Sequence, residues 1–501
     1  MSTPVAQALQ APQALPIEDR SRLLAHWTRC SRLRYLEFHS GPHGFGMRLQ
    51  PQSLPLATGI HVHLGLADIM RRFQKEGLKG VGPGTPAQPQ LDSWELRAGW
   101  REDISKASGR YRQAVERRGF LELVQADEGA EYPTQHVLGE QCALVEGLLW
   151  AFIRVVLPAI LEDFTIVAIE EETELVVGCT CGLGEVNGHD LHAARGCQGV
   201  VVPTRADILL RRKVDGALMN WDYKTSSDIN SRDWKQQWQD NPQLALNSLG
   251  AERQHGEHID FCYILGLDKG HRARTKAEHD LGREKTGPKR QESIFCYAWF
   301  RPGNPPFQDP EWTTSWTYVD AQGKNRTLQG KGFTTRSVWD AGVDAFPQKP
   351  SDWSVMEYWV HWLPEEELRK LFVMHGPIQT PRHLLPNLLR AIHAEGWRWA
   401  ERLYKLYKLR QELEAGHPNM PWVEVHPGME ELLDELAPQS WDCYRWKKWC
   451  QFDSVCKKRL GWEDPLGGKY EIRRPHHAIE LERMKVSGVE PPPEQWEEEE
   501  G

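Results

Sequence analysis

The middle of the chain contains, in order, Thr204-Arg205-Ala206-Asp207-Ile208-Leu209-Leu210, Val214-Asp215-Gly216 and Asn220-Trp221-Asp222-Tyr223-Lys224-Thr225. The first and last runs have strand character, and the Asp-Gly pair between them suits a tight hairpin turn. We therefore expect two strands, over 199–211 and 217–225. Alternate side chains of a strand share a face, so Asp222 and Lys224 point the same way. The antiparallel neighbour strand can bring Asp207 alongside Asp222.

The segments around this hairpin predict an α/β core. Asn241-Pro242 has the form of an N-cap and first helical residue, opening a helix through Leu249. Further strands are expected over 164–170, 174–177, 259–266 and 316–318. Helical patterns are expected over 21–36, 57–73, 94–122, 141–161 and, as one long amphipathic helix, 384–414.

This order of elements divides the chain into six regions, with a helical lobe and insertions around the α/β core. The regions are a flexible leader (1–20), a helical N-terminal region with Cys30 and His63 (21–163), the strand-rich core (164–300), an irregular extension (301–380), a helical C-terminal region with a cysteine cluster (381–470) and an acidic tail expected to be disordered (471–501).

The composition is that of a globular protein, since 40% of the 501 residues are hydrophobic and 26% are charged. No run approaches the roughly 20 consecutive apolar residues of a membrane helix, and the N-terminus lacks a secretory pattern. We therefore expect a cytoplasmic protein with no membrane partner. The net charge of −9 neither indicates nor excludes nucleic-acid binding, which depends on local basic patches. There is no phosphate loop, which argues against a fused helicase motor.

Asp207, Asp222 and Lys224 together indicate metal-assisted chemistry. Two carboxylates held close together are costly unless a cation neutralises them, which favours a Mg²⁺ or Mn²⁺ site. The backbone carbonyl of Tyr223 is a further candidate ligand. Lys224 can orient or deprotonate an attacking water, or stabilise charge on a phosphate. A single Asp-X-Lys is common on exposed strands, so by itself it leaves a purely structural role open.

The hairpin resembles that of the PD-(D/E)XK nuclease superfamily, in its RecB-like exonuclease branch. The family pattern is an Asp, a hairpin and then Asp/Glu-X-Lys, which Asp207 and Asp222-Tyr223-Lys224 match. Gly59-Ile60-His61-Val62-His63 matches the Gly-X-X-X-His element that precedes the core in this family. The resemblance implies that His63 is a further metal ligand, with His61 as the competing candidate.

Two more positions extend the resemblance. Gln243 begins a match to the family's Gln-X-X-X-Tyr helix, which implies a place for Gln243 in the catalytic site. Asn247 stands where the family has tyrosine, so the chain departs from the family at that DNA contact. Glu170 occupies a position where relatives carry an acidic residue.

The resemblance implies a fold and an activity. The expected fold is a restriction-endonuclease-like core, a central mixed β-sheet flanked by helices. The expected activity is that of a metal-dependent deoxyribonuclease, an exonuclease acting on single-stranded or resected DNA in recombination, repair or phage replication. A recombinase or helicase is the implied protein partner.

Four of the 10 cysteines suggest a second inorganic centre. Cys443, Cys450 and Cys456 are separated by six and then five residues, and Cys30 can complete four thiolates. Four thiolates suit zinc or an iron–sulfur cluster, and spacing alone does not choose between them. The family resemblance implies a [4Fe–4S] cluster, with Zn²⁺ as the alternative. Cysteines packed in a tryptophan-rich helical end are the structural alternative.

A third group of possible ligands lies in the middle of the chain. Cys179, Cys181 and Cys197 occur with His189 and His192. Their spacing matches no standard zinc finger, so a simple loop is favoured over a zinc site.

Positive residues beside the hairpin are candidates for DNA contacts. Arg205, Arg211, Arg212, Lys213 and Lys235 could steer phosphates, although strand arginines are usually only solvated. Two other classes of protein fit the same residues. One is a catalytically silent DNA-binding or scaffold protein with this fold, and the other is a zinc-stabilised interaction module whose carboxylates form surface ion pairs.

Overall fold

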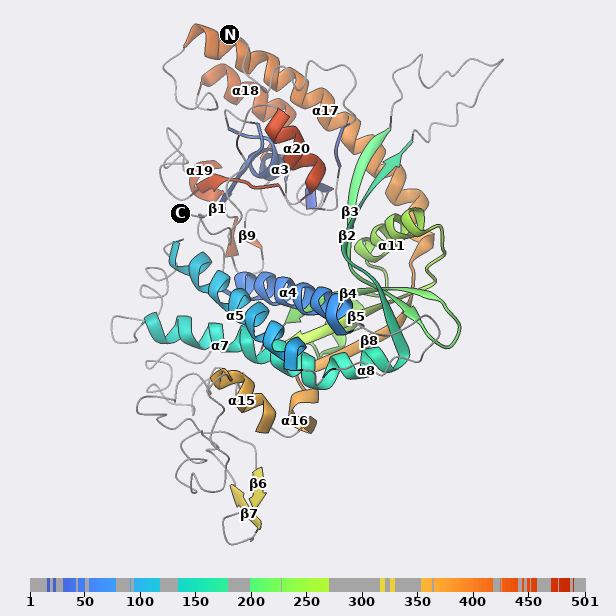
Figure 1. Ribbon diagram of the computed structural model, residues 1–501. Coiled ribbons are helices and arrows are strands. Elements are labelled where there is room, and N and C mark those ends of the chain that lie inside the picture. The colour runs from blue at the N-terminus through green and yellow to red at the C-terminus, as the bar shows by residue number, and fades with distance from the viewer. Residues whose placement is uncertain are drawn as a thin grey trace.

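The computed structural model describes a chain organised in two lobes (Figure 1). The description covers residues 16–18, 21–23, 30–41, 44–49, 54–77, 91, 94–117, 134–178, 199–226, 228–269, 316–319, 325–328, 353–362, 365–417, 424, 426–439, 444–445, 448–450, 452–456, 470–475, 477–486 and 490.

A five-stranded mixed sheet forms the centre of the larger lobe, with strand order β2-β3-β4-β5-β8. The pairs β2–β3, β3–β4 and β5–β8 are antiparallel, whereas β4 and β5 are parallel. Parallel neighbours need a crossover, which α10 and α11 provide on one face of the sheet. The bounds are β2 Phe164–Val177, β3 Val200–Arg212, β4 Leu218–Ser226, α10 Arg232–Gln236, α11 Pro242–His255, β5 Phe261–Asp268 and β8 Phe372–Gln379.

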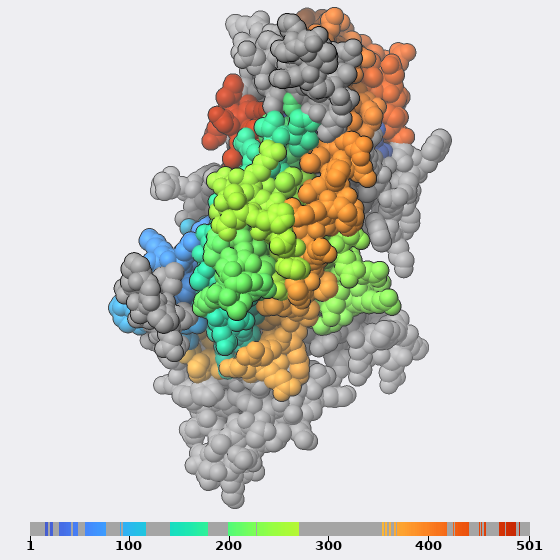
Figure 2. Space-filling model, turned by 90° about the vertical axis from the view of Figure 1, so that its right-hand side faces the viewer, coloured from blue at the N-terminus to red at the C-terminus, as the bar shows by residue number. Residues whose placement is uncertain are grey.

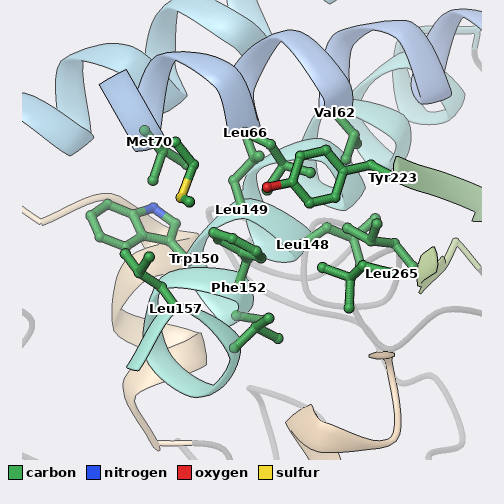
Figure 3. Packing of buried hydrophobic residues seen from close by; sticks show 14 of the residues in the cluster. Val62, Leu66, Met70, Leu148, Leu149, Trp150, Phe152, Leu157, Tyr223 and Leu265 are labelled. Carbon is green, nitrogen blue, oxygen red and sulfur yellow. The ribbon is translucent and has the colours of Figure 1, made fainter. Parts of the chain in front are cut away.

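Helices that precede the sheet in sequence cover its other face (Figure 1). Their apolar sides and the sheet residues Ile208, Trp221 and Tyr223 form the largest buried cluster of the molecule, part of which Figure 3 shows. The helices are α4 Leu54–Arg72 with the π-helical turn η1 Phe73–Gly77, α5 Trp94–Arg117, α7 Thr134–Ala151, the π-helical turn η2 Phe152–Val156 and α8 Leu157–Asp163.

One of these helical segments is apolar enough to span a membrane by length and composition. It runs over Gln141–Asp163, and 78% of its apolar 18-residue window is buried inside the structure. Leu148, Leu149 and Phe152 of this segment pack against the sheet in the main core (Figure 3). We therefore interpret it as a core helix.

The smaller lobe combines segments from both ends of the described sequence (Figure 1). Its apolar cluster contains Leu36 and Met47 from early in the chain and Leu433, Phe452 and Tyr470 from late in the chain. The short strands β1 and β11 pair antiparallel. The elements are α3 Ser31–Phe38, β1 Met47–Leu49, α17 Leu385–Gly416, α18 Pro427–Leu436, α19 Asp453–Cys456, β11 Tyr470–Ile472 and α20 Ala478–Val486.

The helix α17 belongs to both lobes. Its first half lies beside α11, which Figure 2 shows as orange next to yellow-green, and its second half packs in the smaller lobe. The remaining described elements are β6 Trp316–Val319, β7 Asn325–Leu328, α15 Val355–Trp362, α16 Glu365–Arg369, the 3₁₀ turn η4 Arg382–Leu384, β9 Tyr444–Arg445 and β10 Lys448–Trp449.

The expectation of an α/β fold with a central mixed sheet flanked by helices is confirmed at that level. Several local expectations differ from the structure. The acidic tail over 471–501, expected to be disordered, contains most of β11 and the helix α20. The region 301–380, expected to be irregular, contains the edge strand β8. Strand β2 is continuous over 164–177 instead of two pieces. Residues 16–18, assigned to the flexible leader, lie against the sheet, where Ile17 bridges to Val201.

Candidate active site

The two strands of the central hairpin separate at Asp207. Their ladder runs from Arg211–Leu218 to Ile208–Trp221, and Asp207 and Asp222 are the next residues along. Instead of continuing the main-chain pairing, Asp207 Oδ2 accepts a hydrogen bond from the backbone N–H of Tyr223 at 2.7 Å. The carboxylate thus takes the place of a main-chain acceptor where the strands part.

Asp222 is 1% exposed and lies on the face of the sheet that α11 covers. Its carboxylate forms an ion pair with Lys224 and accepts a hydrogen bond from Gln243 Nε2 at 3.1 Å. Gln243 stands in the first turn of α11, where the Asn241 side chain caps its backbone N–H at 2.9 Å. The predicted Asn241 cap therefore fixes the backbone of Gln243, whose side chain orients Asp222.

His63 approaches the same carboxylates from α4. Its Nδ1 atom lies 3.7 Å from Asp207 Oδ2, and its ring meets the Tyr223 ring edge-on at 6.0 Å between centroids. The competing His61 is fully buried beside Tyr111, with ring centroids 5.6 Å apart. His63 is therefore the histidine of this helix that reaches the site.

A glycine lets α4 lie close to the hairpin. A Cβ atom on Gly59 would lie 2.7 Å from Thr225 Oγ1, closer than real Cβ contacts allow. The Tyr223 side chain points away from the carboxylates into the core, between Val62 and Phe152 (Figure 3). Tyr223 therefore contributes its backbone to the site, while its ring anchors the strand.

Burial and mutual repulsion shape the protonation of the carboxylates. Burial, together with the charge of Asp207, raises the pKa of Asp222 to about 6, although Lys224 opposes the shift. Burial also raises the pKa of Asp207, against Lys224 and the Tyr223 N–H. Burial thus disfavours the charged forms of both carboxylates, and a bound cation would offset that cost.

The imidazole of His63 is neutral near pH 7. Burial and the positive charge of Lys224 lower its pKa to about 4. A neutral imidazole has a free lone pair, which metal binding requires. The donor set of two carboxylates, this imidazole and the Tyr223 carbonyl therefore fits a divalent cation in its chemistry.

Glu170 extends the acidic cluster along β2. It has a backbone φ of 50°, in the left-handed region that residues other than glycine seldom adopt. Its carboxylate lies 3.0 Å from the Arg205 guanidinium. Burial and the charge of Asp207 raise the pKa of Glu170 to about 7. The strained residue thus adds a third acidic group beside the two carboxylates of the hairpin.

Sequence reasoning did not identify Trp238, which contacts Lys224. The Lys224 Nζ atom lies 5.5 Å from the centroid of the Trp238 ring, and Trp238 packs edge-on against Trp234. The spacing of the two tryptophans, one helical turn apart, was the available signal. A cation–π contact of this kind restrains the ammonium group beside Asp222.

Most of the basic residues expected to steer phosphates have protein partners. Arg205 pairs with Glu170, Arg211 pairs with Glu257 at 2.6 Å, and Arg212 pairs with Asp215 at 2.5 Å. Lys213 donates to the carbonyl of Leu161 at 2.6 Å, and Lys235 lies in α10. Their role in holding DNA stays a prediction.

Three cysteines of the expected cluster lie in the smaller lobe. Cys30, Cys450 and Cys456 all pack against its apolar cluster. Cys30 is the N-cap of α3, where its Sγ atom accepts a hydrogen bond from the Leu33 N–H at 3.2 Å; the expected helix over 21–36 is therefore wrong at Cys30, which has extended backbone. Cys443 lies outside the described residues, as do Cys179, Cys181, Cys197, His189 and His192.

Within the described part of the chain, no three His, Cys, Asp or Glu side chains are arranged closely enough to form a ready metal site. The metal site on the central hairpin is therefore inferred from the chemistry of its donor atoms, which are carboxylate and carbonyl oxygens and an imidazole nitrogen. Comparison of the sequence with models of known protein families and with curated proteins finds no match.

Proposed function

We propose that this protein is a metal-dependent deoxyribonuclease of the PD-(D/E)XK type, with a restriction-endonuclease-like core. The observation that carries the proposal is the placement of Asp207 and Asp222 where the hairpin strands part, with Lys224 paired to Asp222. The buried structural carboxylate Glu480, paired with Arg22, has a lowered pKa, whereas burial and the charge of Asp207 raise the pKa of Asp222.

The proposed roles follow from the contacts. Asp207, Asp222, His63 and the Tyr223 carbonyl would hold Mg²⁺ or Mn²⁺. Such a cation, when bound, supplies Lewis-acid polarisation of the phosphodiester and lowers the pKa of water.

The chain's other site residues act around those ligands. Lys224 stabilises negative charge on the phosphate and orients the attacking water, and Trp238 restrains its ammonium group. Gln243 holds the carboxylate of Asp222 in place through its 3.1 Å hydrogen bond. The substrate that this proposal favours is DNA with single-stranded or resected ends, cut as an exonuclease, with a recombinase or helicase as partner in recombination, repair or phage replication.

We also propose that Cys30, Cys443, Cys450 and Cys456 hold a [4Fe–4S] cluster, with Zn²⁺ as the alternative. The three described cysteines come from opposite ends of the sequence and pack against one apolar cluster, which supports a shared site. A cluster there would join the N-terminal and C-terminal parts of the smaller lobe.

Degradation of end-labelled single- and double-stranded DNA with Mg²⁺ or Mn²⁺ tests the nuclease proposal. We expect the wild type to release labelled fragments, and Asp207→Asn and Lys224→Ala to lose this activity by about a hundredfold or more. Asp215→Asn is the matched control, because this carboxylate lies in the turn of the same hairpin, where it pairs with Arg212 and accepts a hydrogen bond from the Ala217 N–H at 3.1 Å. Thermal unfolding of each variant verifies that the fold is kept.

The outcomes separate the alternatives. DNA bound but left intact by the wild type with either cation would favour a silent DNA-binding scaffold. Equal cutting by the wild type and Lys224→Ala would place the active site elsewhere. A preparation that neither binds nor cuts DNA and contains zinc would favour a protein-interaction module.

A further inference from the structure

A large cavity lies in the smaller lobe, apart from the candidate active site. Its volume is about 670 Å³, and its walls come from α3, α17 and α20. None of the residues that line it belongs to the carboxylate site on the central hairpin. A cavity of this size falls in the range of sites for small organic ligands.

Aromatic side chains from one helix form a wall of this cavity. Trp397, Tyr404 and Tyr407 recur along α17 at the spacing of one helix face, and Trp399 lies beside them. Tyr404 is 64% exposed, so its ring is accessible at the rim. Such a row of flat, exposed and half-buried rings is suited to stacking against another planar ring.

Three of the four arginines that line the cavity form ion pairs with carboxylates. Arg34 lies over the Trp399 ring at 4.6 Å and forms an ion pair with Glu18 at 2.7 Å. Arg22 pairs with Glu480. Arg410 likewise pairs with Glu424. Because these guanidinium groups already face carboxylates, the cavity suits a planar, largely neutral ring better than a cluster of phosphates.

The same helix connects this cavity to the sheet. The first turns of α17 lie beside α11, the helix that carries Gln243 (Figure 2). In the adjoining turn, Arg382 forms an ion pair with Glu252 of α11. A strand of DNA bound at the cavity would therefore contact α17, and α17 packs against α11. The helix α11 carries Gln243, which orients Asp222.

We propose that this cavity receives an unpaired nucleobase of single-stranded DNA, which stacks on the aromatic face of α17. The inference rests on the proposed function for the presence of DNA, but the binding step needs no cleavage. A free mononucleotide offers the same ring, so the test must distinguish it from a strand.

Binding is measured on full-length protein carrying Lys224→Ala, in the presence of a chelator, so that no cutting occurs. Fluorescence anisotropy of labelled oligothymidylate gives the affinity of the parent and of two variants. Loss of one stacked base predicts about tenfold weaker binding for Tyr404→Ala. Tyr404→Phe keeps the ring and is expected to retain the parent affinity.

Photo-crosslinking locates the contact. Oligonucleotides with 5-iododeoxyuridine are irradiated with the same protein, and crosslinked peptides are identified by mass spectrometry. We expect attachment to residues 397–407, reduced in Tyr404→Ala. Competition by thymidine monophosphate at the strand's own concentration would show that the cavity takes a free nucleotide, which would overturn a strand-binding role.

The results also separate this inference from the proposed function. Crosslinks confined to other regions, with equal affinity for Tyr404→Ala and its parent, would overturn the cavity inference and leave the nuclease untouched. Crosslinks at 397–407 in a protein whose wild type cuts no DNA would keep the cavity as a DNA site while the nuclease proposal fails.

Discussion

Two buried carboxylates in this molecule have pKa values shifted in opposite directions. Burial raises the pKa of each, but Glu480 faces Arg22 and Arg473, whose attraction outweighs burial and lowers its pKa to about 2. Asp222 faces a second carboxylate and one lysine, and its pKa rises to about 6. A carboxylate surrounded by partners stabilises the fold, whereas one left short of positive charge is available to a ligand.

The lowered pKa of Glu480 predicts that part of the free energy of unfolding depends on pH. Its folded pKa of about 2 lies below its ordinary value of 4.5, so its contribution is complete above about pH 4.5 and is lost as the pH falls towards 2. The contribution at neutral pH is on the order of 3 kcal/mol. Chemical denaturation between pH 7 and pH 3 should show a larger acid-induced loss for the wild type than for Glu480→Gln.

Glu482→Gln provides the control for this measurement, since Glu482 lies on the same helix at a more exposed position. This variant should follow the wild-type pH dependence. Parallel curves for Glu480→Gln and the wild type would show that the ion pairs with Arg22 and Arg473 make no pH-dependent contribution to stability.

The packing of whole elements depends on small residues in α4. A Cβ atom on Gly65 would lie 2.5 Å from Leu149 Cδ1 and 3.2 Å from Ala107 Cβ, so α4, α5 and α7 meet closely at this glycine. Gly109, on α5, has no atom within 4 Å of the same hypothetical Cβ. The two glycines thus share a helical setting and differ in the space around them.

We expect Gly65→Ala and Gly109→Ala to change stability in opposite directions. Replacing glycine in a helix gains about 1 kcal/mol from propensity. Overpacking a filled core costs about 1–3 kcal/mol, which applies to Gly65 alone. Thermal unfolding should give a lower Tm for Gly65→Ala and a higher one for Gly109→Ala, and a raised Tm for both would contradict the close packing of α4.

Elements defined by local signals could be predicted from the sequence. The Asp215-Gly216 turn, the Asn241 cap and the apolar periodicity of 384–414 each depend on residues close together, and the structure has the hairpin, α11 and α17 there. The hairpin in turn brings Asp207, Asp222 and Lys224 together. Gln243 was indicated by the family resemblance alone, and the Asn241 cap accounts for its position in the first turn of α11.

Features that depend on distant contacts could not be predicted. Strand β8 pairs with β5 through residues such as His375 and Ile264, and no local pattern identifies that partner. The contact of Trp238 with Lys224 likewise exists only after the α10–α11 crossover has folded. Cys30 was expected inside a helix, but its sulfur caps the first turn of α3 instead, a role that helix periodicity does not reveal.

At the scale of the whole molecule, the smaller lobe is closed by contacts between the two ends of the described sequence. β1 pairs with β11, Arg32 pairs with Asp434 at 2.6 Å, and Tyr35 donates to Glu424 at 3.0 Å. The proposed cluster would add a covalent link at the same place. Protein contacts and, by our proposal, an iron–sulfur cluster would therefore together join the N-terminal and C-terminal segments of the smaller lobe.

Metal analysis tests that proposal. We expect purified wild type to contain iron and acid-labile sulfide, and Cys450→Ala to lose both and to unfold at a lower temperature. Cys142→Ala, in the core of the larger lobe, should keep its iron. Zinc without sulfide in the wild type would favour a zinc site over the iron–sulfur cluster. Unchanged iron content in Cys450→Ala would exclude this cysteine as a ligand.

The pairing of β1 with β11 has a consequence for how the chain is made. Arg48 and Glu471, which form an ion pair across these strands, are 423 positions apart. The chain leaves the ribosome N-terminus first, so α3 and β1 emerge early. Their apolar residues stay exposed until the C-terminal segments that cover them have been synthesised. The central sheet, complete at Gln379, can assemble earlier. Nascent chains halted before Tyr470 should therefore expose the apolar residues of α3 to chaperones while the hairpin is already formed.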